Sequence, residues 1–200
     1  MKNQYHLEKA MLAIFAILTF NSERLSAQFQ KSLESKKIRV VNSTHILRKQ
    51  ITPGQGTRQL VDSNTVRVDG KSDFDKNKLN DDEVLIIQRI RVGYDKHATD
   101  SGLETQLLYN KAVPASFRNA SFRVRQGGSV LYEMPMSDLV NRYTGNSIED
   151  DYVDLANPIV LVGGTEFDFE LVFPEGATPD TVEYLEYAFT GQKAIRSTAA

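Results

Sequence analysis

From residue 38 onward, apolar side chains either alternate with polar ones or come in short bursts, and both patterns are typical of β-strands. The clearest alternation begins at Phe167 and ends at Phe173, and it predicts a strand with one buried and one solvent-facing side. The segments predicted to form strands are 38–41, 44–47, 59–68, 83–94, 105–109, 115–125, 129–133, 159–162, 167–173 and 182–195. One short helix is expected over 137–143, with Ser137 as its N-terminal cap.

Strands that follow one another without helices of 10–15 residues between them favour antiparallel sheets over βαβ units. Two such sheets stacked face to face make a β-sandwich. We therefore expect an all-β, antiparallel β-sandwich domain over residues 38–200, preceded by a separate segment over residues 1–37.

The N-terminal segment contains an apolar run from Ala10 to Phe20, interrupted only by Thr19. A run of this length is too short for a membrane-spanning helix, which needs about 20 residues. Two interpretations remain open. Lys2 and Lys9 could begin a secretory signal that is cleaved near residues 25–27. Alternatively, the segment is retained as a helical arm of roughly 30 residues whose apolar stripe contacts other molecules. The residues expected to make those contacts are Leu12, Phe15, Leu25, Phe29 and Leu33.

The charge is distributed unevenly along the chain. The first 60 residues contain ten basic and three acidic residues, a net charge of +7, while the chain as a whole carries −2, which leaves −9 on the remainder. A basic arm on an acidic body could face nucleic acid, an anionic membrane surface or the body of a neighbouring copy. The cations expected to act in this way are Lys31, Lys36, Lys37 and Arg39.

Catalytic patterns are scarce. The chain has no cysteine, which excludes disulfides, thiolate metal sites and thiol nucleophiles. Its three histidines are widely separated, and no serine lies in a Gly-x-Ser-x-Gly elbow. We expect neither an enzyme nor a cofactor. Asp73, Asp75 and Asn77 alternate as in the first half of a calcium loop, but lysine stands at position 78, where glycine is needed. A solvated loop is the alternative.

The second half of the chain carries a family resemblance in its strands and turns. Residues 117–136 look like a hairpin with Gly127-Gly128 at its turn, leading to a short helix. Residues 157–176 look like a proline, an apolar strand, a glycine turn and a further strand, and residues 182–196 look like a closing strand. With residues 80–93, this pattern resembles the jelly-roll coat and vertex proteins of bacterial viruses. The resemblance implies a single jelly roll, a structural role in a virion and assembly with copies of itself and with other virion proteins.

A β-sandwich with a cleaved signal would instead be an exported bacterial module that binds a glycan or a surface partner. Its aromatic platform would come from Tyr94, Tyr109 and Tyr143. An enzyme built on a sandwich scaffold is the third hypothesis, and a pocket of convergent polar groups would distinguish it.

Overall fold

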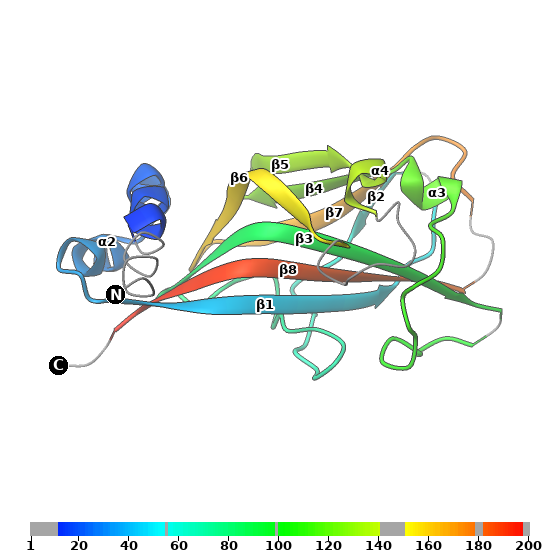
Figure 1. The fold of residues 1–200 in the computed structure, drawn as a ribbon, viewed down its shortest axis with the longest axis horizontal. Coiled ribbons are helices and arrows are strands. Elements are labelled where there is room, and N and C mark those ends of the chain that lie inside the picture. Colours follow the sequence, from blue (N-terminus) through cyan, green and yellow to red (C-terminus); the bar gives the residue numbers. More distant parts are fainter. Residues whose placement is uncertain (1–11, 55, 99, 141–150, 179–181, 198–200) are drawn as a thin grey trace, which may run out of the picture.

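A computed structural model describes residues 12–54, 56–98, 100–140, 151–178 and 182–197. Its described part contains eight strands in two four-stranded sheets, which lie one over the other as two layers (Figure 1). The first sheet has the order β1-β8-β3-β6, and its strands are β1 (Ile38–Gln50), β3 (Glu83–His97), β6 (Val153–Val162) and β8 (Val182–Arg196). The second sheet has the order β2-β7-β4-β5, and its strands are β2 (Gly56–Gln59), β4 (Ser121–Gln126), β5 (Ser129–Pro135) and β7 (Phe167–Phe173). Every pairing between these strands is antiparallel, so the expected all-β, sandwich-like architecture is confirmed.

The main core lies between the two sheets and is rich in aromatic rings. Phe169 of β7 and Phe189 of β8 stack across the layers, with ring centroids 4.7 Å apart. Phe122 of β4 stacks on Tyr187 of β8 at 5.2 Å. These rings come from alternate positions of their strands, which is why the alternating pattern of the sequence identified the inward-facing side.

The predicted strand boundaries agree best where the alternation is long. β7 matches its predicted range, and β3, β5 and β8 differ from theirs by a few residues at the ends. The two short segments predicted over 38–47 are one strand, β1. β6 begins at Val153, six residues before its predicted start. It contains a bulge at 155–158, where four residues stand opposite Gln88 alone, and this bulge interrupts the alternation by which the strand's first part could have been recognised.

Two predicted strands are wrong, and a third, predicted over 115–125, begins only at Ser121. Residues 59–68 leave the sheet after Gln59, and Val66 and Val68 are exposed in the loop that follows. Residues 105–109 form a turn and loop in which Tyr109 has a positive φ of 55°. Residues 115–118 form a short helix, α3 (Ala115–Arg118), before β4.

The second short helix, α4, covers Met136–Leu139 and so begins one residue earlier than predicted. Pro135 holds its N-cap position instead of Ser137. Val140 is already extended, which ends the helix, and the remainder of the predicted range lies outside the described residues.

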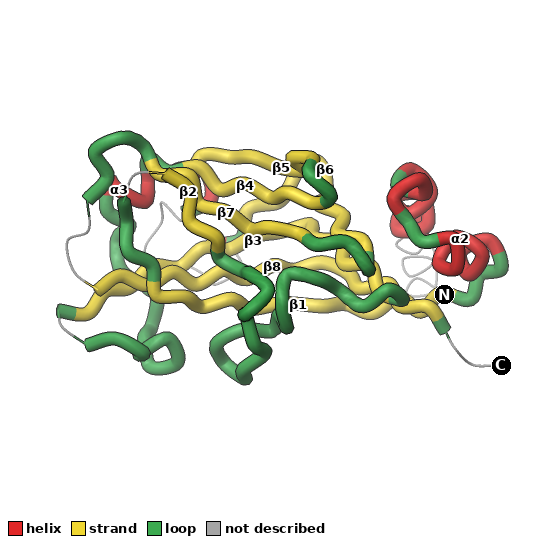
Figure 2. The backbone as a smooth tube through the Cα atoms, turned by 180° about the vertical axis from the view of Figure 1, so that it is seen from behind, coloured by secondary structure: helices red, strands yellow, loops and turns green. Residues whose placement is uncertain are grey.

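The N-terminal segment is helical but broken, so the single helix of roughly 30 residues is also wrong. Residues 12–20 are helical, the 3₁₀-helix η1 (Ser22–Arg24) follows, and α2 (Ala27–Glu34) begins a new axis. The break arises because Ser26 caps α2, its Oγ accepting a hydrogen bond from the Phe29 N–H at 3.2 Å. Both helical pieces lie together at one end of the sandwich (Figure 2). Among the described residues, no helix is long and apolar enough to cross a membrane.

Candidate functional site: the docked N-terminal arm

Residues 12–37, here called the arm, lie against the outer face of the first sheet. The surface of the sheet that the arm covers is here called the dock. It is apolar because the first part of β3 carries apolar side chains on both faces. Leu85 and Ile87 point into the main core, whereas Val84 and Ile86 point outward, under the arm. A strand that is buried on both faces reads as a continuous apolar run, and residues 84–87 form such a run.

The arm and the dock form a second apolar core, separate from the first. Its buried members are Ile14, Leu18, Leu25 and Phe29 from the arm and Ile38, Val84, Ile86, Val160, Val162 and Ala194 from the sheet. Leu18 and Ile86 are fully buried. Burying a side chain of this kind contributes about 1.5–3 kcal/mol, so the contact stabilises the docked arm substantially.

Arg24 makes the first of two polar contacts that fix the arm to the body. Arg24 Nη2 donates to Gln126 Oε1 at 2.7 Å and to the Val160 carbonyl oxygen at 3.0 Å. Gln126, at the end of β4, is itself buried: Oε1 also accepts from the Val162 N–H, and Nε2 donates to the carbonyl oxygens of Val162 and Thr165. Burial lowers the pKa of the Arg24 guanidinium. One amide therefore connects the arm, β4 and β6.

A second polar contact ties α2 to the C-terminal strand. Arg196 Nη1 of β8 donates to Gln28 Oε1 at 2.7 Å. Within the arm, Gln30 Nε2 donates to the carbonyl oxygens of Ser22 and Leu25, which holds α2 against η1.

The residues expected to contact other molecules differ in how far the chain's own sheet buries them. Leu25 and Phe29 are buried against the chain's own sheet, and Phe15 and Leu33 are half-buried. Leu12 remains 69% exposed, and Phe20, at the end of the same helix, is 90% exposed. An arm surface free to meet another molecule therefore exists around Leu12 and Phe20. Phe20 was part of the apolar run but was not singled out in sequence.

The four cations expected to face an anionic partner are all on the surface. Lys31, Lys36, Lys37 and Arg39 are exposed. Three of them lie at the junction of the arm and β1, where Lys36 has a positive φ of 56° and turns the chain from α2 into the sheet.

The calcium candidates have different surroundings from one another. Asp73 Oδ2 accepts a hydrogen bond from the Ile46 N–H at 2.7 Å, which anchors the loop at 71–73 to the edge of β1. Asp75 is exposed and Asn77 is half-buried. Across the described ranges, no three or more His, Asp or Glu side chains are placed to hold a metal ion.

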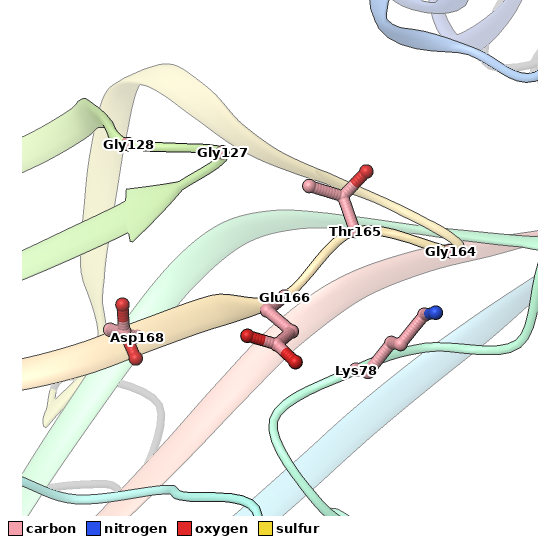
Figure 3. A pocket seen from close by; sticks show the side chains of 7 residues that line it. All are labelled: Lys78, Gly127, Gly128, Gly164, Thr165, Glu166 and Asp168. Carbon is pink, nitrogen blue, oxygen red and sulfur yellow. The ribbon is translucent and has the colours of Figure 1, made fainter.

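A polar hollow lies at the β4–β5 and β6–β7 turns (Figure 3). Its volume is about 450 Å³, and it is lined by Lys78, Gly127, Gly128, Gly164, Thr165, Glu166 and Asp168. Figure 3 shows Lys78, Glu166 and Asp168 at its rim. Asp168 accepts a long hydrogen bond from Gln59, 3.4 Å. The lining offers one lysine, two carboxylates, the Thr165 hydroxyl and the backbone of three glycines.

A cluster of charges on the outer face of the first sheet was missed in sequence. Glu186 of β8 receives Arg48 Nε on Oε2 and Arg91 Nη2 on Oε1, both at 2.6 Å. Nearby, buried Asp95 receives Lys111 Nζ at 2.6 Å and the N–H groups of Leu108 and Tyr109. These contacts hold the loop at 100–113 against the sheet. The sequence does place charged residues at outward-facing positions of β3 and β8. Which of them form ion pairs can be predicted only when the pairing of the strands is known.

The structure describes two of the three tyrosines expected to form an exposed aromatic platform, and neither of them is exposed. Tyr94 and Tyr109 are both buried, and the Tyr94 hydroxyl donates to Glu183 within the chain. The third member, Tyr143, lies outside the described residues. Neither Tyr94 nor Tyr109 therefore offers an exposed ring to a glycan or surface partner.

No family model matches the chain, and no curated protein matches its sequence.

Proposed function

We propose that this protein is a structural virion protein: a capsid subunit, folded as a single jelly roll, that assembles with copies of itself through its sandwich edges and its N-terminal arm. The site of action is in the virion of a bacterial virus, and the partners are other copies of the chain.

The strand pairing is the observation that carries the proposal. The first strand pairs with the eighth, the second with the seventh, the third with the sixth and the fourth with the fifth. Bending one long antiparallel hairpin and rolling it up produces this set of pairs, with successive pairs in alternate sheets. Further contacts, β3 with β8 and β4 with β7, join the pairs within each sheet. Eight strands in two Greek keys define a jelly roll, and viral capsids are among the main users of that fold.

The dock supports retention of the arm. If residues up to about 27 were removed, Ile14, Leu18 and Leu25 would be lost, and the outward side of Val84, Ile86, Val160 and Val162 would face water. Monomeric soluble proteins rarely expose a contiguous apolar patch of that kind. The body sequence thus carries a surface that suits the arm, which a cleaved signal does not require.

The exposed part of the arm supports assembly. Leu12 and Phe20 project from a helix that is already attached to the body by its other side. An anchored apolar surface of this kind suits a neighbouring copy. The exposed cations at the arm–β1 junction suit the acidic body of that neighbour or packaged nucleic acid, with an affinity that falls as salt rises.

The experiment compares assembly of the full chain with that of two arm variants. Light scattering after size-exclusion chromatography, with electron microscopy, should show oligomers or particles for the wild type. Phe20→Lys should weaken assembly while leaving the melting temperature close to wild type, because Phe20 touches little of its own body. Thr19→Lys is the matched control: it adds the same charge at the neighbouring exposed position without removing an apolar side chain. Equal assembly of both variants would argue against the arm contact, and a monomeric wild type would argue against the function.

A further inference from the structure

Each sheet has two outer strands, and three of the four carry features that block pairing with another strand. β2 is short and its four residues are exposed and largely polar. β6 contains Pro158, which has no N–H, and an exposed Asp154. Short strands, proline and charge are the usual protections of a sheet edge.

β1 is protected by a strap. The Arg48 N–H donates to the Lys71 carbonyl at 2.7 Å, and the Asp73 N–H donates to the Ile46 carbonyl at 2.9 Å. Segment 71–73 therefore occupies the outer edge of β1 near the strand's C-terminal end, and the rest of β1 carries exposed polar side chains, Arg39, Asn42 and Thr44.

β5 has neither an internal proline nor a strap, and its one irregularity is a bulge at Leu131, between Val130 and Tyr132. It pairs with β4 on one side, and within the described residues no backbone hydrogen bond reaches its other side. The β5 edge lies along the outside of the two-layered body, with β6 in the other sheet beside it (Figure 1). Its one proline, Pro135, is the last residue of the strand, and its one charge, Glu133, is held by Arg123 of the same chain at 2.8 Å.

The side chains of β5 are apolar and incompletely covered. Leu131, Tyr132 and Met134 pack against the main core but remain half-buried, and Val130 is 51% exposed. The main core therefore reaches the surface along this edge. An additional strand beside β5 would supply hydrogen-bond partners and cover these side chains together.

We propose that two copies of the chain pair through β5, antiparallel about a two-fold axis at Tyr132, joining their second sheets into one eight-stranded sheet. The inference rests on the proposed function, because it names the edge through which self-assembly occurs.

The side chains of β5 are compatible with pairing to themselves. In this register Tyr132 lies opposite Tyr132, and Val130 of one copy lies on the same side of that pair as Met134 of the other, so apolar side chains meet on both sides of the axis. Glu133 of each copy faces the Val130–Leu131 bulge of the other, so the two like charges are not directly opposed. A two-fold contact of this kind uses the same patch on both copies, which is the commonest symmetry among oligomers.

Cysteine cross-linking tests the register in the full chain, which has no cysteine of its own. Residues directly opposite on antiparallel strands have Cα atoms about 4.5–5.5 Å apart, within the range of a disulfide. Under mild oxidation Tyr132→Cys should give a covalent dimer. Val130→Cys should not, because its counterpart lies four residues along the partner strand, and Thr57→Cys on the edge of β2 should not either.

A second variant keeps the test sharp if Tyr132→Cys folds poorly. Val130→Lys places a charge at an exposed position of β5 and should raise the dissociation constant for self-association at least about tenfold, with an unchanged melting temperature. Thr57→Lys is the matched control on β2. The proposed pairing is overturned if the wild type assembles while Tyr132→Cys stays uncross-linked, or if Val130→Lys assembles like wild type. A wild type that stays monomeric overturns the proposed function itself.

Discussion

Arg24 of the arm and Gln126 of β4 are 102 positions apart in sequence, yet a hydrogen bond of 2.7 Å joins them. The contact lies where the arm meets both sheets, because Gln126 also binds the backbone of Val162 in β6. The hydrogen bond therefore fixes the position of the arm on the sheet, in addition to the apolar contacts that hold it there.

Arg24→Ala should lower the free energy of unfolding by about 1–3 kcal/mol, since it removes hydrogen bonds from a charged, half-buried donor. Trypsin should then cut faster after Lys31, Lys36 and Lys37 as the arm loosens. Arg39→Ala, which removes an exposed cation close by, serves as the control and should change neither property. Equal behaviour of the two variants would show that the contact does not hold the arm.

Apolar docking is tested by a double-mutant cycle between Leu18 and Ile86. Ile86→Ala should cost about 2–5 kcal/mol, the range for a large-to-small change at a fully buried site. Combined with Leu18→Ala, the loss should be non-additive by about 0.5–3 kcal/mol, as measured by urea denaturation. Additive losses would mean that the arm does not cover Ile86 in solution.

Gly93 of β3 allows the loop at 100–113 to approach the sheet. A Cβ at Gly93 would lie 2.8 Å from both the Tyr109 Cβ and its carbonyl oxygen. Gly93→Ala should therefore destabilise the fold by about 1–3 kcal/mol and expose Lys111 to trypsin. Tyr109→Phe removes only the hydroxyl bond to the Glu104 carbonyl and should cost about 1 kcal/mol. An unchanged free energy of unfolding in Gly93→Ala would show that the loop does not pack as described.

The carboxylate of Asp95 makes the free energy of unfolding depend on pH in the acidic range. Burial opposes its ionisation, but hydrogen bonds from Lys111 and from the N–H groups of Lys96 and Tyr109 outweigh that effect and lower its pKa. The stabilisation is therefore complete above the ordinary aspartate pKa of about 3.9 and is lost as the pH falls through the lowered value.

Asp95→Asn should remove this part of the acid dependence. We expect a lower melting temperature at pH 7 and a shallower fall between about pH 5 and pH 2 than for the wild type. Asp75→Asn, at an exposed carboxylate, is the control and should follow the wild-type curve. Parallel curves for Asp95→Asn and the wild type would contradict the role of Asp95.

The sequence predicted the strands well where side chains face one core. β7 alternates without interruption, so its limits were found without error. Residues 59–68 and 105–109 also contain alternating or apolar residues, but Leu60 and Val61 are buried from a loop, and Tyr109 is buried through a left-handed turn. Residues that are buried from loops and turns do not recur at a regular interval along the chain. Their burial therefore cannot be predicted from the spacing of apolar residues.

The arm illustrates a second limit. Its apolar residues were identified in sequence, and so was the apolar burst at 84–87. That these two segments cover each other depends on the sheet order, which places β3 and β6 beside each other under the arm. Polar contacts such as Arg24–Gln126 and Arg48–Glu186 have the same origin, because their partners meet only after the strands have paired.

Native mass spectrometry of the full-length chain at micromolar concentration tests the central proposal most directly, because it reports the subunit mass and the number of subunits together. We predict assemblies built from unprocessed chains that retain residues 1–37. A stable monomer with the arm intact, or a chain shortened near residue 27, would contradict the proposal.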